Sequence, residues 1–278
     1  MPLPAPDGAG LTHMARLMGI VNVTPDSFSD GGLFLAPERA IAHGHRLIAD
    51  GAELLDIGGE STRPGARAVS AEEELARVAP VLAGLDGVDA AISIDTSKTA
   101  VAETALDAGA EIVNDVTALR AEPALAGLCA QRGCVVILMH MQGTPRTMQE
   151  NPTYDDVVDD VMAFLAERIE FAVREGIAED RIWVDPGIGF GKTVRHNLEL
   201  LSRLGELRDL GRPLVVGTSR KRFIGSLTDR DVDDRLGGTI ASSILALRAG
   251  ADVLRVHDVA EVHQAVRVAE TILDAAAD

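Results

Sequence analysis

Residues 134–140 read CVVILMH, six apolar residues in a row closed by a histidine. A short run that is apolar on both faces is typical of a strand buried in a parallel sheet, and it is too short to span a bilayer. Seven similar runs occur along the chain: LMGIVNV (17–23), ELLDIG (53–58), AISID (91–95), EIVND (111–115), RIWVDP (181–186), PLVVGT (213–218) and DVLRVH (252–257). A longer segment with helical spacing follows each of them. Eight such units favour a single (β/α)8 barrel, the TIM barrel, over an open doubly wound sheet.

Local signals predict where the helices between these runs begin and end. Ser70 with Glu73 is the pattern of a capping box, and Thr96 or Ser97 is suited to cap the helix after the third run. The longest helix is predicted over residues 155–175. We expect residues 1–16 to form a short, frayed N-terminal segment and residues 17–278 to form the barrel domain.

The charge balance limits the partners that the protein can have. The 278 residues include 26 basic and 43 acidic ones, a net charge of −17, so nucleic acids and anionic membranes would meet a repelling surface. The chain starts without a basic leader followed by an apolar run, and Cys129 and Cys134 fit reduced thiols. We therefore expect a cytoplasmic protein.

Polar residues close each apolar run, and in a barrel all eight ends meet at one mouth, where this architecture builds its sites. These residues are Asn22, Asp56, Asp95, Asn114, Asp115, His140, Asp185, Thr218, Ser219 and His257. A single polar strand end is as often a helix cap or a turn. Eight ends in register indicate a functional site.

Two loops at this mouth are rich in small, polar and proline residues: NVTPDSFSDGG (22–32) and GESTRPGARAVS (59–70). Both could be plain surface connections, but their length and lack of apolar anchors predict mobile loops after strands 1 and 2 that become ordered on binding. Phe28 is a large apolar group that a solvated loop has no need of, so it is a candidate ligand contact.

The scarce positive charges gather near the same mouth. Arg63 lies in the second loop, the run from Arg220 to Arg222 follows the seventh strand, and Arg255 and His257 point to one side of the eighth. The loops after strands seven and eight are the usual phosphate site of this fold, which favours an anion site here.

The chain lacks the residues that other reactions of barrel enzymes require. His43 and His45 are two apart in a helix, where side chains diverge, so they are poor metal ligands. Lys221 stands between two arginines after its strand, unlike a desolvated Schiff-base lysine. Neither a GxSxG elbow nor a GxGxxG or Walker A pattern occurs.

Eight segments together resemble the dihydropteroate synthase family, folate-pathway transferases that sulfonamides inhibit. In family order they read MGIVNVTPDSFSDGG, DIGGESTRPGA, SIDT, NDV, LMHMQGTP, DPGIGFGK, GTSRKRFIG and LRVHDV. The resemblance covers residue 17 to the C-terminus. It implies a Mg²⁺-dependent, homodimeric enzyme that joins two small molecules, 6-hydroxymethyl-7,8-dihydropterin pyrophosphate and 4-aminobenzoate. The products would be 7,8-dihydropteroate and pyrophosphate, formed by dissociative loss of pyrophosphate.

The resemblance also implies roles, position by position. The pterin site would comprise Asp95, Asn114, Met139, Asp185, Phe190, Gly217, Lys221 and Arg255. The pyrophosphate site would comprise Asn22, Thr62, Arg63, Arg255 and His257, with Asn22 as the Mg²⁺ ligand. The aminobenzoate pocket would comprise Phe28, Pro64, Phe190, Ser219, Lys221 and Arg222. The residues implied in catalysis are Asp95, Asp185, Lys221, Arg63, Arg255 and His257.

One position departs from the family pattern, because Arg222 stands where many members have serine. The aminobenzoate carboxylate would then rely on the helix N-terminus or on the arginine itself. A pterin-binding methyltransferase is the nearest alternative enzyme, but it would not need the TPDSFSDGG and STRPGA loops. A non-catalytic pterin-binding relative would be expected to have lost Asn22, Arg63 or Lys221, and all three are present.

Overall fold

The computed structural model describes residues 15–24, 36–62 and 65–275. Its strands are β1 (Arg16–Asn22), β2 (Leu54–Gly58), β3 (Ala91–Asp95), β4 (Ile112–Asp115), β5 (Val135–Met139), β6 (Ile182–Asp185), β7 (Val215–Val216) and β8 (Val253–Val256). Seven of them lie within their predicted runs, and β1 overlaps the run at 17–23. The first strand begins at Arg16, one residue before the predicted barrel segment.

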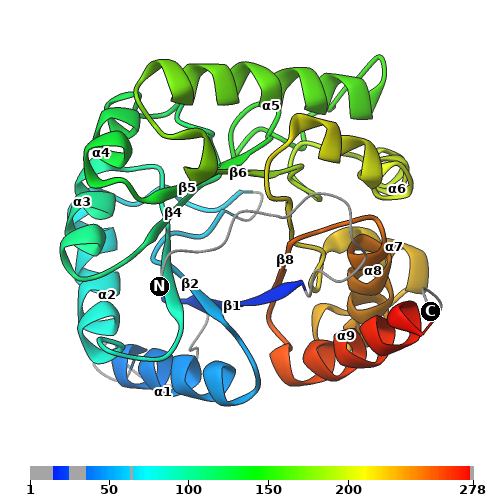
Figure 1. The fold of residues 1–278 in the computed structure, drawn as a ribbon, viewed down its shortest axis with the longest axis horizontal. Helices are drawn as coiled ribbons and strands as arrows, with labels where there is room; N and C mark the ends of the chain where they lie inside the picture. Colours follow the sequence, from blue (N-terminus) through cyan, green and yellow to red (C-terminus); the bar gives the residue numbers. More distant parts are fainter. Residues whose placement is uncertain (1–14, 25–35, 63–64, 276–278) are drawn as a thin grey trace.

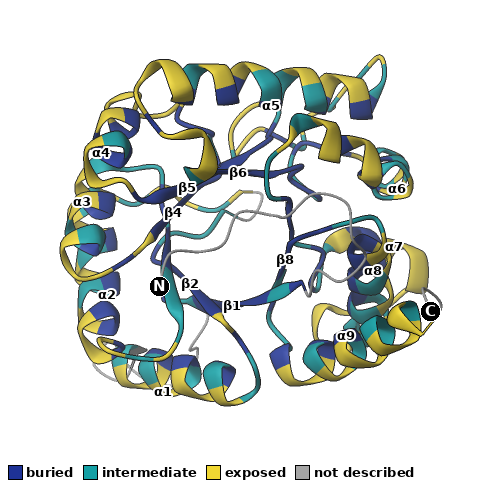
Figure 2. Ribbon diagram, viewed as in Figure 1, coloured by how far each residue is buried: buried dark blue, intermediate teal, exposed yellow. Residues whose placement is uncertain are grey.

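The α-helices between and after the strands are α1 (Ala36–Ala49), α2 (Ala71–Gly84), α3 (Thr99–Asp107), α4 (Ala124–Arg132), α5 (Val157–Arg174), α6 (Val194–Ser202), α7 (Arg222–Thr228), α8 (Leu236–Arg248) and α9 (Val259–Asp274). They form a ring around the strands (Figure 1). In Figure 2 the strands and the inward sides of the helices are largely buried. None of the described helices combines the length and apolarity needed to cross a bilayer.

The strands pair in parallel in the order β6-β5-β4-β3-β2-β1-β8-β7. The two outer strands of this series meet at a parallel bridge between Val184 and Leu214, where the Val184 amide also donates to the Pro213 carbonyl at 2.9 Å. This bridge closes the sheet on itself, and the predicted (β/α)8 barrel is confirmed.

Local signals set several of the helix boundaries. Asp156 caps α5 by accepting from the amides of Val158 and Asp159, within the predicted boundaries of the longest helix. Ser70 caps α2 as predicted, through a 3.2 Å bond from the Glu73 amide.

Two cap predictions differ from the structure. The Glu73 carboxylate pairs with Arg77 one turn further along α2, which competes with the reciprocal half of the predicted capping box. Helix α3 begins after Lys98 without a side-chain cap, because the Thr96 hydroxyl accepts from the Lys98 amide in a local turn before the helix.

The barrel interior is built in two layers because strand side chains alternate between faces. The lower layer is apolar and consists of Met18, Leu54, Ile112, Val135, Ile137, Trp183, Val215 and Val253. Two residues further along five of these strands stand Asp56, Asn114, Met139, Asp185 and Arg255. The eight apolar residues of the lower layer, called the apolar plug below, therefore support a largely polar upper layer at the carboxyl ends of the strands.

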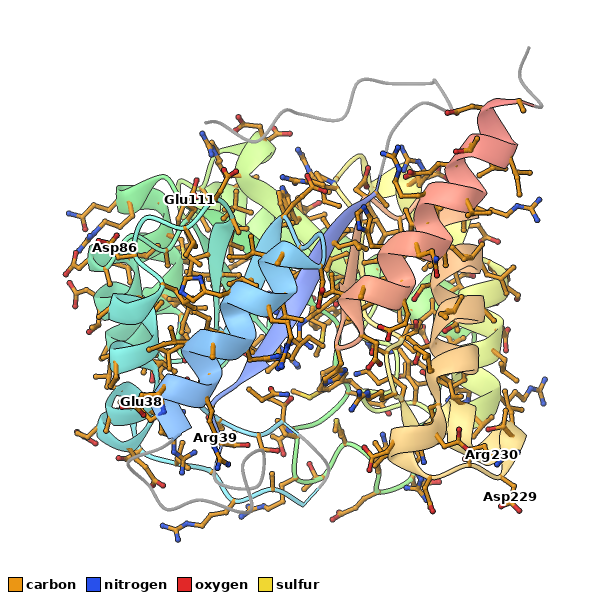
Figure 3. The ribbon with its side chains drawn as sticks, turned by 90° about the horizontal axis from the view of Figure 1, so that it is seen from below. Glu38, Arg39, Asp86, Glu111, Asp229 and Arg230 are labelled. Atoms are coloured by element: carbon orange, nitrogen blue, oxygen red, sulfur yellow. The ribbon has the colours of Figure 1, made fainter. Side chains whose placement is uncertain are left out.

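Figure 3 shows the two ends of the barrel from the side. Glu38 and Arg39, at the start of α1, and Asp229 and Arg230, just after α7, lie toward one end. Asp86, which follows α2, and Glu111, which precedes β4, lie toward the other. The end marked by Glu38 and Arg230 is the one on which the strands terminate, where the polar layer opens.

Ile137 tests the apolar plug because its side chain is completely buried at the centre of that layer. We expect Ile137→Ala to lower the free energy of unfolding by about 2–5 kcal/mol, from lost burial and from the cavity that remains. Urea denaturation would measure the change. Ile272→Ala on α9 is the control, because that side chain is 64% exposed, and it should change stability by less than about 0.5 kcal/mol. Equal losses would mean that the plug does not carry the fold.

Candidate active site

One pocket opens at the carboxyl ends of the strands and measures about 350 Å³, open mouth included. Its lining comprises Thr62, Asp95, Asn114, Val116, Met139, Asp185, Gly187, Ile188, Phe190, Gly217, Lys221 and Arg255. All eight residues that the sequence resemblance implies for a pterin site lie in this lining. They come from strands β3 to β8 and the loops that follow, so the barrel brings together residues up to 160 positions apart.

Arg255 lies at the floor of the pocket between two carboxylates. Its Nε donates to Asp56 at 2.6 Å and its Nη2 donates to Asp95 at 3.0 Å. Asp56 is fully buried and also accepts from Asn114 at 3.0 Å and from the Ser93 hydroxyl at 2.6 Å. Strands β2, β3, β4 and β8 are thereby joined through their side chains. A buried charge needs such partners, because an unpaired one costs several kcal/mol.

The shared arginine leaves its two carboxylates with one positive charge between them. Burial, followed by the neighbouring Asp56 carboxylate, raises the pKa of Asp95 to about 8, although Arg255 opposes this shift. Burial lowers the pKa of Arg255, but Asp56 and Asp95 outweigh burial and leave that pKa above its ordinary value. The arginine is therefore a permanent cation, whereas Asp95 is poised to exchange a proton.

Asp185 enters the pocket from β6, at the start of a glycine-rich loop. Its Oδ1 accepts from the Gly187 amide at 2.7 Å. Gly187 has a φ of +66°, and a Cβ there would lie 1.9 Å from the His140 carbonyl oxygen, so only glycine fits. Burial raises the pKa of Asp185, while the Gly187 amide and the charges of Lys221, Arg255 and Lys192 lower it.

Lys221 and Phe190 form the opposite wall. The Lys221 Nζ lies 4.1 Å from the centre of the Phe190 ring, a cation–π contact. Burial, with help from the charge of Arg255, lowers the pKa of Lys221 to about 8. Arg220, just before it, has a φ of +56° and is held by a pair of bonds to Asp258. This local twist turns the chain so that Lys221 reaches the pocket.

Four other predicted site residues lie outside the pocket lining. Ser219 is buried and its hydroxyl is 3.0 Å from Nδ1 of His257, whose own amide donates to the same hydroxyl at 3.1 Å. Burial, then the charges of Arg255 and Arg220, lowers the pKa of His257 to about 3. Asn22 ends β1 and is half-buried, and Arg222 begins α7 and is exposed.

Phe28, Arg63 and Pro64 lie outside the described residues, as does most of the first predicted loop, so their predicted roles stay predictions. The described residues contain no group of three or more His, Cys, Asp or Glu side chains arranged to hold a metal ion. The amide oxygen of Asn22 is a hard ligand of the kind that Mg²⁺ accepts. It fits a metal that receives its other ligands from a phosphorylated substrate and from water.

Three lining residues were missed by the sequence analysis: Val116, Gly187 and Ile188. Asp56 was predicted to meet the other polar strand ends at the mouth but was given no role there; it stands two residues after Leu54 and therefore shares the inward face of β2. Val116 and the two loop residues are placed by turns whose geometry the sequence does not reveal.

The fold and this pocket define a (β/α)8-barrel enzyme whose site gathers carboxylates, an amide and cations around one pocket. The chain belongs to the family described as "Pterin binding enzyme", whose model matches residues 18–257. It is 47% identical over 266 residues to the dihydropteroate synthase of Escherichia coli K12, covering 95% of this chain and 94% of that protein.

Two solved structures of Xanthomonas albilineans dihydropteroate synthase are also similar. The one with 4-aminobenzoic acid shares 49% identity and a TM-score of 0.88, with 93% of each chain covered. The one in complex with 7,8-dihydropteroate shares 45% identity and a TM-score of 0.85, with 95% of each chain covered.

The raised pKa of Asp95 makes stability depend on pH. The folded state holds this proton more tightly than the unfolded state, where the pKa is near 4, so the stabilisation is complete below about pH 4 and lost as the pH approaches about 8. The amide in Asp95→Asn does not titrate. From pH 5 to 8.5 the wild type should therefore lose on the order of 4 kcal/mol of unfolding free energy relative to the variant, because one pH unit corresponds to about 1.4 kcal/mol.

Urea denaturation of both proteins at the two pH values would measure this difference. Asp86→Asn is the control, since Asp86 is an exposed aspartate at the opposite end of the barrel. A difference between wild type and Asp95→Asn that is the same at both pH values would contradict the raised pKa.

Proposed function

We propose that the protein catalyses the dihydropteroate synthase reaction, joining 6-hydroxymethyl-7,8-dihydropterin pyrophosphate to 4-aminobenzoate with release of pyrophosphate. The observation that carries the proposal is the meeting of Asp95, Asn114, Asp185, Lys221 and Arg255 in one pocket. The relatives and solved structures named above support it. The direct test is incubation with both substrates and Mg²⁺, in which dihydropteroate and pyrophosphate should form in equal amounts.

Pterin recognition follows from the hydrogen-bonding groups of the pocket. A pterin presents N–H donors on its pyrimidine edge, which suit the carboxylates of Asp95 and Asp185, and acceptors, which suit the Asn114 amide and the Lys221 ammonium. Met139 and Phe190 supply apolar surface for the faces of the ring.

The chemistry would be the loss of pyrophosphate followed by capture of a pterin-methyl cation. Asp185 and Asp95 line the pocket in which positive charge would develop, and an ionised carboxylate there would stabilise that cation more than the neutral substrate. Because the pKa of Asp95 is about 8, Asp95 would contribute its charge only in the fraction that has lost its proton. Lys221 and Arg255 balance the two carboxylates before the charge forms. An arylamine is neutral and nucleophilic at pH 7, so the reaction needs no strong general base.

The departing pyrophosphate would bind donors and cations at the rim of the pocket. The low pKa of His257 keeps its ring neutral. The Ser219 hydroxyl already accepts from the His257 amide, so its own proton is free to go to Nδ1, which leaves Nε2–H to donate to an anion. Thr62 adds a hydroxyl, and we assign Arg63 to the same anion. Mg²⁺ held by Asn22 would neutralise charge on the leaving oxygens.

The aminobenzoate would bind beside Phe190 and Lys221, with Ser219, Phe28 and Pro64 completing its pocket. Arg222 is exposed at the start of α7, directly after Lys221. We assign its guanidinium to the aminobenzoate carboxylate in place of the serine found in many members, because a bidentate pair with a carboxylate suits arginine. We also propose that the protein acts as a cytoplasmic homodimer.

Replacing Asp185 by Asn tests the stabilisation of the cation. Loss of the charge should cost a few kcal/mol of transition-state stabilisation, or roughly a 10²- to 10³-fold drop in turnover. Initial rates at saturating substrates would measure it, with Asp180→Asn, an exposed aspartate, as the control. An Asp185→Asn enzyme within threefold of wild type would remove Asp185 from this role.

Chelation tests the metal. Turnover should fall at least about tenfold in excess EDTA and return when Mg²⁺ is added. Asn22→Ala should raise the Mg²⁺ concentration needed for half-maximal rate by about 10-fold or more. Full activity in EDTA would contradict the metal requirement, and an unchanged Mg²⁺ dependence would remove Asn22 as its ligand.

A further inference from the structure

Lys192 is one of only three lysines in the chain, and its side chain is 3% exposed. It lies behind the pocket wall and is not part of the pocket lining. Its Nζ is 2.8 Å from Nδ1 of His140, 3.0 Å from the Gly187 carbonyl and 3.1 Å from the Phe190 carbonyl.

Two carbonyl oxygens, which can only accept, and the His140 ring nitrogen surround the Lys192 Nζ. An ammonium has three N–H donors, so it satisfies all three contacts when the His140 ring carries its proton on Nε2. Burial, followed by the Lys192 charge, lowers the pKa of His140 to about 2, so the ring is neutral. We assign this pair as an ammonium beside a neutral ring.

These contacts hold the loop that shapes the pocket. Gly187 is fixed at both backbone groups, because its N–H donates to Asp185 and its carbonyl accepts from Lys192. The Phe190 carbonyl is held by the same ammonium, while its ring faces Lys221 in the pocket. The His140 amide donates to the Asp185 carbonyl at 2.9 Å, so the ammonium joins the ends of β5 and β6 to the loop.

The same ammonium acts on the charge of Asp185. The groups that face Lys192 are the neutral His140 ring, the Asp185 carboxylate and the second cation Lys221, and Arg120 adds positive charge near His140. Burial leaves the pKa of Asp185 above its ordinary value, although the Gly187 amide, the charges of Lys221 and Arg255 and, least of these, the charge of Lys192 lower it. Burial in turn lowers the pKa of Lys192 to about 7.

We propose that Lys192 is a positioning residue for the pterin site: its buried ammonium fixes the loop that carries Gly187 and Phe190, and it favours the ionised form of Asp185. The role deepens the proposed function, since an ionised Asp185 is what would accept from the pterin edge.

Titration of the ligand-free protein tests the effect on Asp185 without any turnover. The Asp185 carboxyl carbon can be followed by NMR in protein with ¹³C-labelled aspartate and assigned with Asp185→Asn. Lys192→Met should raise the Asp185 pKa by about one pH unit, and Lys192→Gln, which keeps two donors but no charge, should raise it as much. Arg195→Met, which removes an exposed charge three residues away, should leave it unchanged. An unchanged Asp185 titration in a folded Lys192 variant, or an equal shift in Arg195→Met, would overturn the proposal.

Kinetics test the consequence for the substrate. Lys192→Met should raise KM for the pterin pyrophosphate roughly tenfold, and KM for aminobenzoate less, and should move the acid limb of kcat/KM to higher pH. A purely structural role would lower the amount of active enzyme without moving that limb. If the wild type formed no dihydropteroate, the proposed function would fail, while the NMR titration would still decide the role of Lys192.

The wild type supplies a measurement that does not depend on the folding of variants. Protein with ¹⁵N-labelled lysine has three side-chain signals, which Lys98→Met and Lys221→Met assign by elimination. At pH 6 the Lys192 nitrogen should have the chemical shift of an ammonium. A neutral amine at that pH would overturn the proposal.

Discussion

The contact of Arg255 with Asp56 and Asp95 is the interaction on which the site depends. A barrel of this kind normally fills its interior with apolar side chains, and here the upper layer is polar. Such a layer is stable only if its charges are paired, because each unpaired buried ion costs several kcal/mol. Arg255 supplies that pairing and at the same time joins β8 to β2 and β3. The fold and the site thus share one set of contacts.

Around this pair the carboxylates and cations alternate. Arg255 lies between Asp56 and Asp95, and Asp185 lines the same pocket together with Lys221. Lys192 lies outside the lining and contacts the loop after Asp185 through the Gly187 carbonyl. Each carboxylate of the pocket therefore has cations among its neighbours.

The sequence predicted the barrel well because each strand is a short run apolar on both faces, a pattern that depends only on local residues. Barrel geometry predicted that Asp95, Asn114, Asp185 and Arg255 meet at one mouth, and the family resemblance assigned them, with Met139, Phe190 and Gly217, to a pterin site. The separate roles of Asp56 and Asp115 could not be predicted. Both are aspartates of buried strands, but Asp56 pairs across the barrel, whereas Asp115 accepts from the amides of Thr117 and Leu119 in its own turn. Only the three-dimensional partners distinguish them. Lys192 was passed over for the same reason.

The contact between β6 and the start of β7 is the weakest strand pairing around the pocket in the described residues. Strand β7 has two residues, and within the described residues a single bridge, from Val184 to Leu214 just before β7, joins this side of the barrel to β6. Local opening of a protein costs least where few backbone hydrogen bonds must break. Asp185 stands directly on one side of this seam, and Lys221 follows the strand on the other. Local opening of the barrel between Asp185 and Lys221 would therefore break fewer ladder contacts than opening between any other neighbouring strands of the described residues.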